Sequence, residues 1–143
     1  MNIRSVIAVL GGMVIMFFLI ELVEPPTVAL LASQRPTGMD EYLAARNEPA
    51  VLGGRVAVFV VVGLLAGYMV AKIAGEHELA HAGAAFALQA FLMFRGFAAD
   101  PSAPLLPWWI LGGLVLVTGA AILTGAAIRA RAAKLAPTQE VES

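Results

Sequence analysis

Four apolar stretches, each about as long as a lipid bilayer is thick, constrain the fold of this chain more than any other feature. They are residues 3–23, 51–74, 79–99 and 107–128. A helix of about 20 apolar residues crosses the ~30 Å hydrocarbon core of a membrane with all its peptide groups hydrogen-bonded internally. We therefore expect an all-α fold, a four-helix transmembrane bundle whose main partner is the lipid bilayer.

Composition excludes several other classes of protein. Of the 143 residues, 60% are hydrophobic and 13% are charged, whereas soluble domains average about 45–50% and about 25%. The net charge of −1 leaves no basic surface to neutralise phosphates, so no nucleic-acid partner is expected. The sequence contains no cysteine, which rules out disulfide bonds and thiolate metal sites.

The boundaries of the stretches indicate a single transmembrane domain over residues 1–136. Pro25 and Pro26 follow the first stretch and are expected to end its helix, since proline lacks the backbone N–H and clashes with the preceding turn. No small-residue cleavage site precedes them, so we interpret the first stretch as a retained helix rather than a signal peptide. The polar residues 137–143 are expected to form a disordered tail.

Basic residues indicate how the bundle is oriented. Arg4 precedes the first stretch, Lys72 ends the second, and Arg129, Arg131 and Lys134 follow the fourth. Basic residues next to membrane helices stay on the cytoplasmic side. The pattern therefore predicts a multi-pass protein of the cell inner membrane with both termini in the cytoplasm.

The connection between the first two stretches is long and is predicted to lie on the outer side. It contains residues 39–46 (MDEYLAAR), which favour a short helix at the membrane surface. Thr37 and Asp40 are its candidate caps. Trp108 and Trp109 begin the fourth stretch on the same side, where indole rings favour the membrane interface.

Small residues recur every four positions along the second stretch, at Gly63, Gly67, Ala71 and Gly75. The third stretch offers Ala80, Ala84 and Ala87 in a similar way. Small side chains at this spacing let a neighbouring helix approach closely. Two interpretations stay open, namely a seam inside the bundle or a face for a second copy or a partner subunit.

Residues 77–81 (HELAH) match the zinc motif H-E-x-x-H, in which two histidines one helical turn apart bind the metal. A catalytic zinc also needs a third protein ligand, and the chain has no further histidine. His77 and His81 are therefore weak metal candidates, and we expect no bound metal or cofactor. The alternative is that both are interfacial polar groups, with His81 bonded to a backbone carbonyl.

Charged residues within the stretches form a second candidate site. Glu21, Arg55 and Arg95 all fall near the outer ends of their stretches and are expected to form one cluster. The cluster is either a structural clamp or a binding site for an anion, a proton or a lipid headgroup. Gln89 and Thr118 lie at mid-depth, where an interhelical hydrogen bond is expected.

Several features recur in order along nearly the whole chain, namely Glu21, Pro36 with Gly38, residues 63–74 (GLLAGYMVAKIA), His81-Ala82 and Trp108-Trp109. The layout that they form resembles an uncharacterised group of small bacterial four-helix integral membrane proteins with no assigned activity. The resemblance implies a fold and an orientation but no mechanism.

The function that these patterns favour is non-enzymatic. We expect an accessory or structural subunit, or a homo-oligomer, that acts by helix–helix packing. One alternative is a small carrier or permeation unit that works as an oligomer through Glu21, Arg55 and Arg95. The other is a zinc hydrolase centred on the H-E-x-x-H motif.

Overall fold

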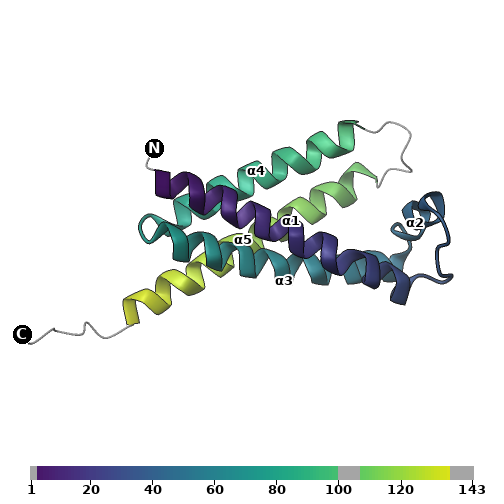
Figure 1. The fold of residues 1–143 in the computed structure, drawn as a ribbon, viewed down its shortest axis with the longest axis horizontal. Coiled ribbons are helices and arrows are strands. Elements are labelled where there is room, and N and C mark those ends of the chain that lie inside the picture. Colours follow the sequence, from purple (N-terminus) through teal and green to yellow (C-terminus); the bar gives the residue numbers. More distant parts are fainter. Residues whose placement is uncertain (1–2, 100–106, 136–143) are drawn as a thin grey trace, which may run out of the picture.

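The computed structural model describes residues 3–99 and 107–135, and this part of the chain is built from α-helices and short connections (Figure 1). The predictions for residues 100–106 and for the tail at 137–143 lie outside the described residues. The helices, in chain order, are α1 (Ile3–Leu31), α2 (Met39–Ala45), α3 (Pro49–Ala74), α4 (Glu78–Ala99) and α5 (Trp108–Leu135).

Three of these helices, α1, α3 and α5, are long and apolar enough to cross a membrane. The expected all-α, membrane-type architecture is confirmed at this level. Over the described residues α4 is not among the candidate spans. Its 22 residues include Glu78, His81, Gln89 and Arg95, so the prediction of four crossings still depends on how these polar side chains are accommodated.

The expectation that Pro25 and Pro26 end the first helix is wrong, because α1 continues through both of them to Leu31. Each proline removes one N–H group that would have bonded the carbonyl four residues earlier. Those carbonyls belong to Glu21 and Leu22, which are exposed, as are both proline rings. The lost hydrogen bonds therefore fall on the outer side of the helix.

Contacts beyond the prolines stabilise the last turns of α1. The Thr27 hydroxyl donates to the Val23 carbonyl at 2.8 Å. Val28 is fully buried and packs with Ala45 of α2 and Val51 of α3 in a small core of its own. Burial of these apolar side chains favours the continued helix over an early end.

The long helices form a bundle with α3 at its centre, packed against α1, α4 and α5. The start of α1, the α3–α4 connection and the end of α5 lie at the same end of the bundle (Figure 1). Arg4 Nε donates to the Ile73 carbonyl at 2.8 Å there, and Arg129 lies 4.0 Å from Glu78. We call this the basic end, and the opposite end, where α2 lies, the α2 end.

The α3–α5 contact brings the two backbones close together at several glycines. A Cβ atom added at Gly67 would overlap the backbone of Ile122, and one added at Gly125 would overlap the Leu64 carbonyl. At Gly63 it would lie 2.9 Å from the Ala121 Cβ. The small residues of α3 therefore form a seam inside the bundle, which was the first of the two interpretations.

The other two positions of the predicted stripe have different surroundings. Ala71 is fully buried in the main core. Gly75 ends α3 in the left-handed conformation, with φ of +74°, which only glycine adopts readily. Its Cα lies beside the Arg4 guanidinium, so Gly75 belongs to the connection at the basic end rather than to the seam.

Helix α2 confirms the short helix predicted between the first two long ones. Gly38 is its N-cap and supplies no side-chain bond. Instead, the backbone N–H and the hydroxyl of Thr37 donate to Glu41 at 2.7 and 2.8 Å. Thr37 was expected to accept a hydrogen bond as the cap, but it donates its N–H and hydroxyl to the Glu41 carboxylate instead. Asp40 lies in the first turn of α2 and is not its cap.

Candidate functional site

Three charged side chains from three helices meet at the α2 end. Glu24 Oε1 of α1 lies 2.6 Å from Arg46 Nε, just after α2, and 3.2 Å from Arg55 Nε of α3. The exposed fractions of the side chains are 9% for Glu24, 32% for Arg46 and 5% for Arg55. Together with Tyr42, we call these residues the Glu24 cluster.

Local sequence explains how the cluster is assembled. Glu24 faces inward because α1 continues past its prolines, and Val28 one turn later anchors the same face. Tyr42 of α2 packs on that apolar anchor, and its ring centroid lies 5.9 Å from the Arg46 guanidinium carbon. Burial, together with the nearby Glu24 carboxylate, raises the pKa of the Tyr42 hydroxyl above its ordinary value of 10.

The cluster has more positive charge than its own carboxylate can balance. Two guanidinium groups face one carboxylate, and neither contact has the directional geometry of a hydrogen bond. The Nη1 atom of Arg55 is also buried, with no hydrogen-bond partner among the described residues. A buried polar donor without an acceptor is unfavourable, so this site calls for an explanation beyond packing.

The three residues that the sequence placed in one cluster differ in burial and in partners. Arg55 is buried against Glu24, whereas Glu21 and Arg95 are exposed on α1 and α4. No ion pair or hydrogen bond involves either of them within the described part of the chain. The acidic partner was missed because Glu24 was assigned to the connection, and only a helix that continues through Pro25 brings it inward.

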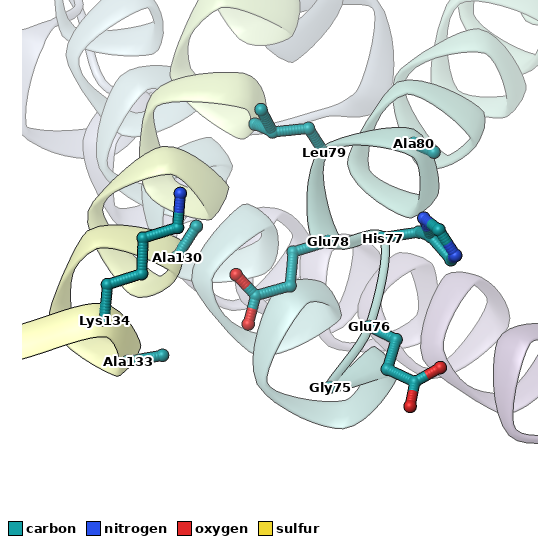
Figure 2. Close-up of a pocket in the computed structure, with 9 residues that line it drawn as sticks. All are labelled: Gly75, Glu76, His77, Glu78, Leu79, Ala80, Ala130, Ala133 and Lys134. Atoms are coloured by element: carbon teal, nitrogen blue, oxygen red, sulfur yellow. The ribbon is translucent and has the colours of Figure 1, made fainter. Parts of the chain in front are cut away.

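The first four residues of the H-E-x-x-H motif, His77 to Ala80, line an open pocket of about 500 Å³ at the basic end, and His81 is not part of its lining. His77 has a φ of +48° and precedes α4, which begins at Glu78, so the motif does not lie on one helix. Figure 2 shows Glu78 on the side of the pocket that carries Lys134, with His77 pointing the other way. The Glu78 carboxylate therefore points away from His77 and does not lie beside it as the motif requires.

The second histidine has the backbone contact that was expected of it. His81 Nδ1 lies 3.0 Å from the His77 carbonyl oxygen. Over residues 3–99 and 107–135, no three histidine, aspartate or glutamate side chains gather as a metal site would require. The residues around the pocket are therefore arranged as the first turn of a helix and not as the ligands of a hydrolytic metal site.

The expected interhelical hydrogen bond at mid-depth is not formed by the Thr118 hydroxyl. That group donates to the Leu114 carbonyl of its own helix at 2.7 Å. Gln89 is 2% exposed, and its carbonyl oxygen has no partner among the described residues. Both residues are buried in the bundle, but within the described residues neither forms the predicted interhelical hydrogen bond.

Two exposed helix faces complete the set of candidate sites. On both faces the residues recur at alternating intervals of four and three, which is the pattern of helices that pack side by side. The α4 face consists of Ala80, Ala84, Ala87, Phe91 and Phe94, with Arg95 beside them. The α1 face consists of Ile3, Ile7, Leu10, Val14, Phe17 and Glu21.

Comparison with known proteins adds no relative. No family model matches this chain, and neither the curated proteins nor the solved structures include a match to it. The two exposed faces and the Glu24 cluster are therefore the features of the molecule that bear on its function.

Proposed function

We propose that this protein is a non-enzymatic subunit of a bacterial inner membrane that works as a homo-oligomer. The α1 face of one copy packs against the α4 face of the next. Each copy crosses the membrane four times with both termini in the cytoplasm. The gathering of Arg4, Lys72, Arg129 and Lys134 at one end of the bundle supports this orientation, because such residues stay on the cytoplasmic side.

The proposal rests on one observation. Two opposite charges are exposed at the same distance from the basic end, one on the α1 face and one beside the α4 face. Glu21 lies 17 positions after Arg4, and Arg95 lies 17 positions after Glu78. Arg4 and Glu78 both lie at the basic end, so each exposed charge is about 25 Å from it at about 1.5 Å per residue. An arginine at that depth is costly unless it pairs.

Pairing between copies removes this cost. Because α1 and α4 both run away from the basic end, they stay parallel when two copies sit side by side in one membrane. Glu21 of one copy then meets Arg95 of its neighbour. Both members of the pair belong to the same chain, and this favours a second copy over an unrelated subunit.

The shapes of the two faces support the same arrangement. The α1 face presents large side chains such as Leu10 and Val14, whereas the α4 face presents Ala80, Ala84 and Ala87. Large side chains fit between alanines of a parallel helix, which gives close contact without overlap. The two faces differ, so the contact is head-to-tail and closes into a ring when the rotation permits.

This arrangement also supports a membrane crossing by α4. Glu78 lies near Arg129 at one end of α4, and a neighbouring copy covers Arg95 near the other. The permeation alternative required Glu21, Arg55 and Arg95 in a single site. The zinc alternative required His77 on the helix with His81. Among the described residues no ion pair joins Glu21 or Arg95 to Arg55, and His77 precedes the helix that carries His81, so we propose neither function.

Exchange of the two charges tests the proposal. The oligomeric state of the purified full chain in mild detergent is measured by native mass spectrometry and by crosslinking in native membranes. Glu21→Arg and Arg95→Glu should each lower the oligomeric fraction, because each brings like charges together. The double variant that exchanges both charges should restore it, and the exposed Arg131→Glu should have no effect.

Two results would overturn the proposal. A wild-type chain that is monomeric both in membranes and in mild detergent has no such interface. A double exchange that stays as dissociated as the single variants shows that Glu21 and Arg95 do not pair between copies. A different protein that co-purifies and is lost with Arg95→Glu would replace the second copy as the partner.

A further inference from the structure

We infer that the Glu24 cluster is a binding site for an oxyanion of the phosphate class, either a lipid headgroup or free phosphate. The inference does not require the proposed oligomer, because its binding groups are Arg46 and Arg55 rather than Glu21 and Arg95. Glu21 lies outside the cluster, although its charge reaches Tyr42. The inference rests on the charge, the hydrogen bonding and the position of Glu24, Arg46 and Arg55.

The charge of the cluster calls for a second anion. Arg46 and Arg55 are both cations at neutral pH, and Glu24 can balance only one of them. Arg55 has a side chain only 5% exposed, so water cannot solvate its charge as it would at the surface. An uncompensated charge in a place of low polarity is unfavourable, and a bound oxyanion makes the cluster neutral.

The hydrogen bonding of the cluster also leaves room for an acceptor. A guanidinium group has five N–H donors, and the contact of Glu24 with each arginine is made at Nε. Arg55 Nη1 is buried without a partner among the described residues. Planar guanidinium groups bind phosphate oxygens in pairs, so an oxyanion can use the terminal N–H groups that Glu24 leaves unused.

Arg46 is the accessible member of the cluster. Its side chain is 32% exposed, whereas those of Glu24 and Arg55 are almost covered. The ligand therefore enters from the Arg46 side, and a rotation of that side chain opens the way to Arg55. Tyr42, with its ring beside Arg46, forms one wall of the entrance.

The position of the cluster fits a phosphate at the membrane surface. Glu24 lies 20 positions after Arg4 on the same helix, which is about 30 Å at about 1.5 Å per residue. That distance equals the thickness of the hydrocarbon core, about 30 Å, so the cluster lies at the level of the headgroups. Lipid phosphates and phosphate from the water phase both reach this level.

Binding to the purified full chain in mild detergent provides the test. Inorganic phosphate is titrated by calorimetry, and retention of phosphatidylglycerol or phosphatidylcholine is measured by native mass spectrometry. We expect the wild type to bind at least one of these probes. Arg46→Gln should weaken that binding about tenfold or more, since it removes a charged donor. Arg35→Gln, at an exposed arginine outside the cluster, should leave it unchanged.

Glu24→Gln gives a result of the opposite sign. It raises the net charge of the cluster from one to two positive charges, so it should tighten the binding of the anion. If the cluster were a purely structural ion pair, neither the wild type nor this variant would bind the probes. This variant is also expected to have a lower Tm, because Arg55 then lacks its carboxylate, and added probe should raise its Tm more than that of the wild type.

The outcomes separate the sources of the ligand. Binding of phosphate without lipid assigns the site to a free anion, and retention of either lipid assigns it to a headgroup. The inference is overturned if no probe binds, or if Arg46→Gln and Arg35→Gln behave alike. It is also overturned if Glu24→Gln weakens the binding of a folded protein.

Discussion

Two stripes of small residues have nearly the same spacing but opposite environments. Gly63 and Gly67 of α3 are buried against α5, where added side chains would meet the backbone of the other helix. Ala80, Ala84 and Ala87 of α4 are all exposed. The comparison shows that the spacing of small residues predicts a capacity for close packing but does not identify the neighbour.

The difference follows from the place of each helix in the bundle and from the size of the residue. Both helices contact three others, but the stripe of α3 faces α5, whereas α4 uses other residues for its internal contacts and leaves its alanine stripe exposed. Glycine allows contact between backbones, whereas alanine keeps a methyl group between them. A glycine stripe therefore suits a fixed internal crossing, and an alanine stripe suits a contact made between folded copies.

The largest expected effect is at the buried stripe. Gly67→Leu would place a large side chain where even a methyl group overlaps the Ile122 backbone. We expect a loss of about 3 kcal/mol or more, the upper end for an overpacked core, and little folded protein in detergent extracts. Gly113→Leu is the matched control, since Gly113 is exposed on α5 with no atom in reach of an added Cβ.

Thermal unfolding followed by circular dichroism measures both variants. Equal Tm values for Gly67→Leu and Gly113→Leu would show that the α3–α5 crossing is not the close contact described here. If Gly67→Leu folds with an unchanged Tm but no longer forms the oligomer, the α3 stripe contacts another copy rather than α5.

A smaller effect of opposite sign is expected on the buried side of α4. Gln89 has a carbonyl oxygen that is buried and has no hydrogen-bond partner in residues 3–99 and 107–135. Gln89→Met keeps the length of the side chain and removes this polar group, so we expect a gain of about 1 kcal/mol in the free energy of unfolding. Chemical denaturation in mixed micelles measures it, and a loss of stability would indicate that Gln89 has an acceptor or donor in the folded protein.

The apolar stretches predicted the long helices well, because hydrophobic length is a property of the sequence alone. The rotation of each helix about its axis was not predictable in the same way. Glu21 and Glu24 lie three residues apart on one helix, yet the first is exposed and the second is buried. The packing of α1 against α3 decides which of the two carboxylates contacts Arg55. The spacing of residues within α1 does not predict that packing.

The prolines show a second limit of sequence reasoning. Pro25 and Pro26 disfavour a helix locally, but the burial of Val28 beyond them outweighs the lost hydrogen bonds. Tertiary packing overrides local preference here, and the candidate site depends on it, because the continued helix is what brings Glu24 inward. The H-E-x-x-H motif fails for a related reason, since the chain turns at Gly75 and leaves His77 outside the helix.

The exposed stripe should tolerate a large side chain as far as the fold is concerned. Ala84→Leu lies on the α4 face, and we expect it to change the free energy of unfolding by less than about 0.5 kcal/mol. It should nevertheless lower the oligomeric fraction, because it fills the space that the α1 face of a neighbour would occupy. Ala57→Leu, exposed on α3, is the control and should change neither quantity. A lower Tm with an unchanged oligomer would instead place Ala84 in an internal contact.

The smallest effect is expected where neither stripe takes part, at the start of α2. The backbone N–H of Thr37, and then its hydroxyl, donate to Glu41 and lower the pKa of that carboxyl below its ordinary value of 4.5. A lowered pKa means that the contact stabilises α2 above that value and is lost as the pH falls through the pKa of the folded state. The protection of α2 against hydrogen exchange, relative to the intrinsic exchange rate at each pH, should therefore fall on acidification, while the α3–α5 seam stays protected. Glu41→Gln should lower the protection of α2 already at neutral pH, and a seam that loses protection together with α2 would contradict the separation of the two regions.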